Sequence, residues 1–256
     1  MATKKGTKEV AVADEKTLAK VAGAYQQEGR GTVIQFPRIC LAAQDDEDKD
    51  LKAGQFYIER QSDEVDEETG KKVFEREKIK DGLEVMIYYK RHQLQYFDGK
   101  DFFNSPIYDL PDEVLPLWKK GTEVHRGTPA ELRAEYEYKD PTTKKVKTLL
   151  QDSRILYVIY KDELYQMNLR GSHMYALLKY ERGVNPTTVI TKLSSEYQKK
   201  GKNEWNQMTF AIVKKLTPTQ ATLVAEKQDE LIQKIAEQKA GFEEAEKPEG
   251  KNGDDY

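Results

Sequence analysis

The chain has 256 residues, which is enough for one large domain or two small ones with a buried core. Its apolar fraction of 38% is low and its charged fraction of 34% is high, so we expect a folded centre with charged loops or ends. A single cysteine, Cys40, and three histidines exclude an intramolecular disulfide and a four-ligand Cys/His zinc site. We therefore expect a reducing, cytoplasmic environment.

The net charge of −3 argues against a domain that is basic throughout. Acidic residues, however, cluster at 45–50, at 62–68 and near the C-terminus, so the remainder can carry a basic face. No stretch has the length and apolar character of a signal segment or a membrane span.

The first third of the chain predicts an arm followed by strands. Residues 1–32 are expected to form a flexible arm, with a short helical pattern that begins at Asp14. Residues 33–40 predict an edge strand, because Pro37 interrupts an otherwise β-prone run. Residues 55–60 and 71–77 predict a hairpin around an acidic turn.

The longest β-prone run covers residues 83–103. Its alternation places Leu83, Val85, Ile87 and Tyr89 on one face and Met86, Tyr88, Lys90 and His92 on the other. We expect the first face to be buried and the second to be open to a ligand.

An irregular insertion is expected at about 104–131, where four prolines and two glycines leave room for at most a helical turn around residues 113–119. Residues 133–151 and 154–170 then predict two hairpins, the second with a tight turn at 161–163. A helix is expected next, with Ser172 as N-cap and Gly183 at its C-terminal end.

The last elements are a strand pair at 187–197 and 203–215 and a helix over 216–242, for which Thr217 is the N-cap. The helix carries an apolar stripe that should pack on the sheet, formed by Ala221, Val224, Ala225, Leu231 and Ile235. Residues 243–256 predict an acidic flexible tail. The fold class is thus β-rich α+β, with an OB-like antiparallel β-barrel over residues 33–215, a mid-chain helix and a C-terminal helix.

Catalytic motifs are missing from the sequence: it contains no phosphate-binding loop, dinucleotide fingerprint, HExxH or GxSxG. The paired carboxylates lie in loops, and His92, His125 and His173 have no partner at a telling spacing. We therefore expect a protein that is not an enzyme and that needs no metal and no cofactor.

Aromatic and basic residues interleave on three predicted strands, which is the combination that single-strand binders use to stack bases and neutralise phosphates. A β-rich core with lysines at its strand ends would have a similar composition, so that alternative stays open. The candidate nucleic-acid-binding residues are Tyr88, Tyr89, Lys90, Arg91, Tyr96, Arg154, Tyr157, Lys161, Arg170 and Trp205.

The chain closes on Asp254, Asp255 and Tyr256, acidic residues capped by an aromatic one. This end resembles the acidic tails of bacterial and bacteriophage single-stranded DNA-binding proteins. Residues 152–195 and 203–220 also resemble a phage replication-module pattern of two strands, a helix, a TxVxT strand, an aromatic strand and a final helix. The resemblance implies that the tail recruits replication or recombination proteins. The Cys-rich zinc insertion of some phage single-strand binders is missing here.

The sequence thus predicts a phage-type protein that binds and protects single-stranded DNA during replication or recombination. A non-catalytic protein-interaction or virion structural module is the first alternative, because exposed aromatics also form subunit interfaces. A nuclease or recombination factor is the second alternative, in which acidic side chains gather only on folding.

Overall fold

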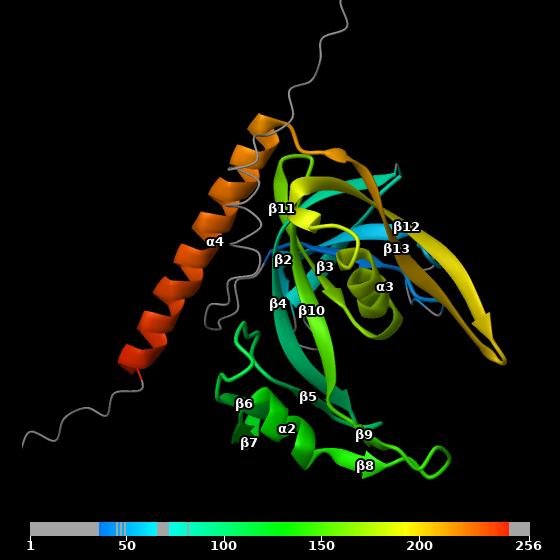
Figure 1. Ribbon diagram of the computed structural model, residues 1–256, viewed down its shortest axis with the longest axis vertical. Coiled ribbons are helices and arrows are strands. Elements are labelled where there is room, and N and C mark those ends of the chain that lie inside the picture. The colour runs from blue at the N-terminus through cyan, green and yellow to red at the C-terminus, as the bar shows by residue number, and fades with distance from the viewer. Residues whose placement is uncertain are drawn as a thin grey trace, which may run out of the picture. The chain divides into compact units, whose positions relative to one another are not determined.

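A computed structural model describes residues 36–44, 46, 48, 50–65, 72–80 and 82–245 (Figure 1). These residues divide into two compact units. The first unit contains residues up to Arg91 together with Gln151–Gln228, and the second contains His92–Leu150 and the described residues from Asp229 onward. The expected arm at 1–32, with its helical pattern at Asp14, lies outside the described residues.

The first unit is a mixed sheet with strand order β3-β2-β1-β11-β10-β4. The β12–β13 hairpin joins it where β12 pairs with β4, and β1 pairs with β11 in parallel. Among the described residues no pairing joins β3 to β13, so this sheet is open and mixed, whereas the sequence predicted an antiparallel barrel. Its elements are β1 (Arg38–Leu41), β2 (Phe56–Val65), β3 (Lys72–Lys78), β4 (Leu83–Phe97), β10 (Gln151–Tyr160), β11 (Glu163–Leu169), α3 (Gly171–Glu181), η1 (Pro186–Thr188), β12 (Val189–Lys200), β13 (Asn203–Lys215) and the start of α4 (Pro218–Ala245).

The core of the first unit lies on one face of this sheet, where Leu83, Val85 and Ile87 of β4 pack with Leu156 of β10 and Leu177 of α3. The alternation predicted for β4 is therefore confirmed on that face.

The sequence predicts that the opposite face of β4 is open to a ligand, but in the structure this face is covered. Tyr88 is fully buried, and its ring lies 6.2 Å from that of Tyr157. Met86 and Lys90 are half-buried. Strands covered on both faces lose the polar alternation that marks a solvent-facing side.

The strand expected at the edge of the sheet is an interior one. β1 pairs with β2 on one side and with β11 on the other. Pro37 precedes the strand, and its carbonyl accepts a hydrogen bond from the Gln166 N–H at 2.9 Å. Proline therefore removes no ladder donor here, which is why it is tolerated beside a central strand.

The second unit contains the end of β4 and three further paired strands in the order β4-β5-β6-β7. Leu94, Leu117 and Leu132 belong to its own core. Its elements are β5 (Phe102–Asn104), β6 (Leu115–Lys119), β7 (Thr122–Gly127), α2 (Pro129–Glu135), β8 (Glu137–Lys139), β9 (Val146–Thr148) and the later part of α4.

The segment expected to be an irregular insertion is largely ordered. Residues 115–119 form a strand in place of the predicted helical turn, and Lys120 and Gly121, both with positive φ, turn the chain into β7. α2 then begins with a capping box between Thr128 and Glu131.

The predicted mid-chain helix and C-terminal helix are both present, as α3 and α4. α3 starts two residues earlier than expected, with Arg170 as N-cap in place of Ser172 and no side-chain cap. Thr217 caps α4 through a hydrogen bond from the Gln220 N–H at 3.3 Å. The predicted stripe of α4 is buried except for half-buried Ala225, and Gln228 joins it. No described helix is long and apolar enough to cross a membrane.

The predicted tight turn between β10 and β11 is confirmed. Tyr160 pairs with Glu163, and the two residues between them, Lys161 and Asp162, have φ of 49° and 65°. Two left-handed residues in a two-residue loop define a type I′ turn, which favours Asn-Gly.

The combined change Lys161→Asn and Asp162→Gly should raise the free energy of unfolding by up to about 1 kcal/mol, because both new residues adopt positive φ more easily. Urea unfolding followed by circular dichroism would measure the change. Asp162→Ala, which suits positive φ less well, is the matched control and should lower stability. A loss of stability in the Asn-Gly variant would contradict this account of the turn.

Candidate nucleic-acid interface

The distal part of the β12–β13 hairpin, residues 194–209, extends past the other strands of its unit (Figure 1). β12 pairs with β4 only over Thr191–Leu193, and among the described residues the rest of the hairpin pairs only with itself. Gly201, with φ of 64°, forms the turn. We call residues 194–209 the hairpin extension.

The hairpin extension carries one exposed aromatic ring and, at or next to its turn, two exposed lysines. Tyr197 is 55% exposed, and Lys200 and Lys202 are exposed without a carboxylate partner among the described residues. Lys199, by contrast, forms an ion pair with Glu204. Such a surface can stack a base on the ring and place phosphates against two unneutralised ammonium groups.

Glu204 fixes the positions of two side chains on the hairpin extension. Its carboxylate accepts hydrogen bonds from Lys199 and from the Tyr197 hydroxyl, and these bonds lower the Glu204 pKa. The same carboxylate raises the pKa of Tyr197, because the hydrogen bond that the Tyr197 hydroxyl donates to it favours the protonated form, and a phenolate beside it would also be repelled. Glu204 therefore stays ionised and holds Tyr197 and Lys199 on one side of the hairpin.

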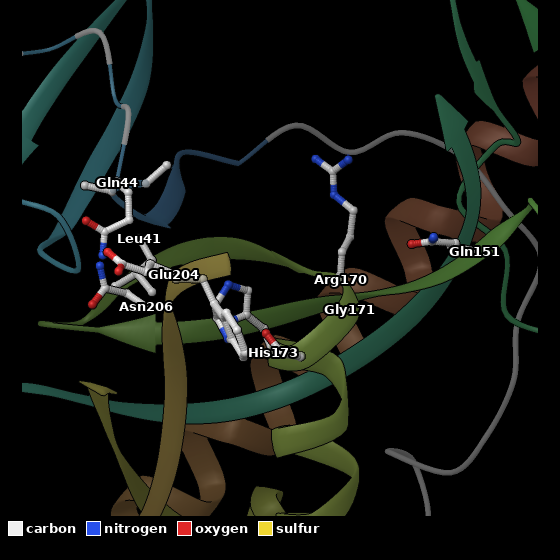
Figure 2. Close-up of a pocket in the computed structure, with 12 residues that line it drawn as sticks. Leu41, Gln44, Gln151, Arg170, Gly171, His173, Glu204 and Asn206 are labelled. Carbon is white, nitrogen blue, oxygen red and sulfur yellow. The ribbon is translucent and has the colours of Figure 1, made fainter. Parts of the chain in front are cut away.

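A pocket of about 440 Å³ lies beside the hairpin extension at residues 204–206, wholly within the first unit (Figure 2). Figure 2 shows Gln151 and Arg170 on one side of it and Gln44 and Asn206 on the other, with His173 between them. The lining comes from the end of β1, the start of β10, the N-terminus of α3 and the start of β13: Leu41, Ala42, Ala43, Gln44, Gln151, Arg170, Gly171, Ser172, His173, Glu204, Trp205 and Asn206.

Two contacts hold the pocket walls together. The Met208 backbone N–H donates to Nδ1 of His173 at 2.9 Å, which ties the N-terminus of α3 to β13. On the other side Gly54, with φ of 77°, lies so close to the hairpin that a Cβ atom there would be 2.6 Å from Ser195 Oγ and 2.8 Å from Asn206 Cγ. Only glycine fits both this φ and this spacing.

The pocket is rich in hydrogen-bond donors. Trp205 Nε1 and Asn206 Nδ2 are buried without a hydrogen-bond partner among the described residues. An unsatisfied buried donor costs about 1–3 kcal/mol, so a side-chain shift that opens one of them to a bound acceptor would recover that cost. Arg170 adds a positive charge at the rim. Desolvation and then the neighbouring Arg38 lower its pKa, but a guanidinium stays charged at neutral pH.

The structure brings together two of the ten predicted binding residues, Arg170 and Trp205, at this pocket. They are 35 positions apart in the chain and meet because α3 packs on β13. Four others are at most 1% exposed and form part of the core, where they cannot offer a ring or a charge to a ligand: Tyr88, Tyr89, Arg91 and Tyr157.

The remaining predicted residues are dispersed. Lys90 forms an ion pair with Glu181 at 3.2 Å, and Arg154 is half-buried. Tyr96 stacks on Phe103 in the second unit. Lys161 is exposed at the β10–β11 turn, over the ring of Tyr160. Asp254, Asp255 and Tyr256 lie outside the described residues.

Sequence reasoning missed Tyr197, Lys200, Lys202 and His173. The turn that carries the two lysines was recognised, and a tyrosine directly before a lysine-rich turn was a readable signal. His173 had no such signal, because its partner is a backbone N–H 35 residues away.

No protein-family model matches the chain, and neither a curated protein nor a solved structure matches it. Among the described residues no group of three or more His, Cys, Asp or Glu side chains is arranged to hold a metal ion.

The bond from Met208 to His173 makes a pH dependence predictable. Burial lowers the pKa of His173 below its usual value of about 6.5, and a protonated Nδ1 could not accept the bond. Below that pH the unfolded chain takes up a proton that the folded chain refuses, so stability falls as pH decreases. Arg170 and Glu204, the charged groups of the same pocket, stay ionised in this range.

His173→Gln should reduce this loss, because the glutamine Oε1 can accept the same bond and does not titrate. Chemical unfolding at a series of pH values between 7.5 and about 5 would measure it. His125→Gln, in the second unit, is the matched control and should keep the full pH dependence. Equal pH profiles for His173→Gln and the unchanged protein would contradict the assignment.

Proposed function

We propose that this protein binds single-stranded DNA without catalysing a reaction, through the hairpin extension and the pocket beside it. The observation that carries the proposal is a hairpin that protrudes from its sheet, with exposed Tyr197 on one face and exposed Lys200 and Lys202 at or next to its turn. A ring face and free ammonium groups within a few residues match the two chemical surfaces of a single strand.

The preference for single strands follows from the same geometry. A base can stack on Tyr197 only when its own face is free, and in a duplex both faces are covered by neighbouring pairs. Phosphate contacts alone would not discriminate, since duplexes carry a denser line of charge. The aromatic contact is therefore the source of selectivity, and the lysines supply affinity that depends on salt.

Two finer parts of the proposal rest on the sequence. One is that the sheet is related to the OB fold. The proposed binding needs only a curved sheet that carries the hairpin, and the open strand order is compatible with this without a closed barrel. The other is the recruitment of replication or recombination proteins by Asp254, Asp255 and Tyr256.

A protein-interaction module is the second candidate, and one observation in the second unit favours it. Phe97 and Phe102 face each other across the β4–β5 pair and are 58% and 41% exposed. Exposed aromatic pairs are typical of the centres of protein interfaces. Sedimentation of the protein with Phe97→Ser would detect a self-association that depends on this pair.

Replacing Lys200 and Lys202 by Ala should weaken binding of a labelled oligothymidylate and reduce the slope of log affinity against log salt by about 1.4, or about 0.7 for each lost phosphate contact. Fluorescence anisotropy at several salt concentrations would measure both quantities. Lys139→Ala with Lys145→Ala, two exposed lysines of the second unit, makes the same charge change and should leave the slope unaltered.

The aromatic contribution has its own variant pair. Tyr197→Ala should reduce affinity about tenfold, and Tyr197→Phe should retain most of it because the ring remains. If both lysine pairs change the slope equally and Tyr197→Ala binds normally, the hairpin extension is not the site. Equal affinity for duplex and single-stranded oligonucleotides would remove the proposed function itself.

Deleting residues 246–256 should raise affinity for single strands at low salt, because the acidic residues compete with phosphates for the same lysines. The difference should shrink as salt increases. An anisotropy titration of both forms, with thermal melting as the control for folding, would measure it. Weaker binding by the shortened protein would instead make the tail part of the binding surface.

A further inference from the structure

The pocket beside the hairpin extension has the size and walls of a small-molecule site. Its volume of about 440 Å³ lies within the range of about 300–1,000 Å³ that is usual for such sites. Exposed Gln44, Gln151 and Arg170 lie at its rim, so the pocket opens to solvent, whereas Ala42 is buried in its wall.

The walls suit a flat ligand with hydrogen-bonding edges. Trp205 and His173 supply two aromatic rings, and Leu41 and Ala42 supply an apolar surface. Around them the amides of Gln44, Gln151 and Asn206 offer both donors and acceptors. Nucleobases have this combination of an apolar face and a mixed donor and acceptor edge, and proteins recognise unstacked bases by stacking together with edge contacts.

The charges around the pocket favour an anionic group on the side where Arg170 lies. Glu204 is engaged by Lys199 and Tyr197, so its negative charge is already balanced. Arg170, at the N-cap of α3, supplies positive charge beside the first backbone N–H groups of the helix, which have no side-chain cap. An anionic group attached to a base in the pocket would meet Arg170 at the rim.

The position along β13 connects the pocket with the proposed binding surface. Trp205 is three residues from Lys202, which corresponds to about 10 Å along an extended strand. A strand of nucleic acid that contacts the tip of the hairpin can therefore reach the mouth of the pocket.

We propose that this pocket takes up one nucleobase of the bound strand, unstacked from its neighbours, with the adjoining phosphate against Arg170. The inference rests on the proposed function and adds base recognition to it. The hairpin extension would then bind the backbone without regard to sequence, and the pocket would prefer some bases over others.

Mononucleotides test the pocket apart from the hairpin extension. The chain has two tryptophans, so Trp118→Phe, in the second unit, leaves Trp205 as the only indole reporter. The four deoxynucleoside monophosphates would be titrated at constant ionic strength, with inorganic phosphate as the control. We expect saturable quenching of Trp205 by at least one nucleotide, unequal affinities among the four, and no quenching by phosphate.

Ala43→Phe would fill the pocket from an exposed position, and circular dichroism would check that the fold is kept. It should weaken mononucleotide binding at least tenfold and reduce the base preference among oligonucleotides while leaving the salt slope intact. Lys200→Ala with Lys202→Ala should have the opposite effects: it should reduce the salt slope of oligonucleotide binding and leave the affinity for mononucleotides unchanged. Arg170→Ala should weaken the binding of nucleotides more than the binding of the corresponding nucleosides.

The outcomes separate the two proposals. Oligonucleotide binding through the lysines with no mononucleotide quenching would overturn the base pocket and leave the function standing. Quenching or competition by inorganic phosphate as strong as by nucleotides would show an anion site in place of a base site. Failure of oligonucleotides and mononucleotides alike would overturn both.

Discussion

The hydrogen bond from the Met208 N–H to His173 Nδ1 is the contact on which the candidate site depends. Among the described strands β13 pairs only with β12, and an uncovered strand edge exposes donors and acceptors that invite pairing with another chain. α3 covers part of that edge, with a second contact from Gln207 to the Ser172 carbonyl at 3.5 Å. Gly54 presses on the hairpin from the turn before β2. β13 is thereby held at Asn206, Gln207 and Met208, directly next to Trp205 in the pocket wall.

The parts of the fold that local chemistry dictates could be predicted from the sequence. The β10–β11 turn and the start of α4 depend on residues within four positions of each other, namely Lys161 with Asp162 and Thr217 with Gln220. The ordered segment at 104–131 could not be read in this way. Pro116 lies within β6 and Pro129 is the first residue of α2, so a composition typical of loops conceals a helix start and a hairpin whose Leu115 and Leu117 enter the core.

The candidate site was predictable only in part, because sequence periodicity cannot show whether the second face of a strand is covered. Tyr88 and Tyr157 alternate with core residues as surface aromatics would, yet distant segments enclose them; the Phe36 ring, for example, meets Tyr157 edge-on at 5.8 Å. Arg170 and Trp205 were identified for their chemistry, but their meeting depends on the packing of α3 on β13. Such contacts between residues far apart in the chain leave no local pattern.

The charge distribution sets how much of the proposed site's affinity would come from phosphate contacts and how much from aromatic contacts. The net charge is −3, and on the hairpin extension Glu204 already neutralises Lys199, so the cations proposed to meet phosphates are Lys200, Lys202 and, at the pocket, Arg170. Three cations release few counterions, so electrostatics alone would give weak binding with a shallow salt dependence. Most of the affinity must then come from aromatic contacts, each worth about 1–3 kcal/mol per stacked base. A protein built this way loses little affinity in salt and is sensitive to how freely the bases of its ligand can unstack.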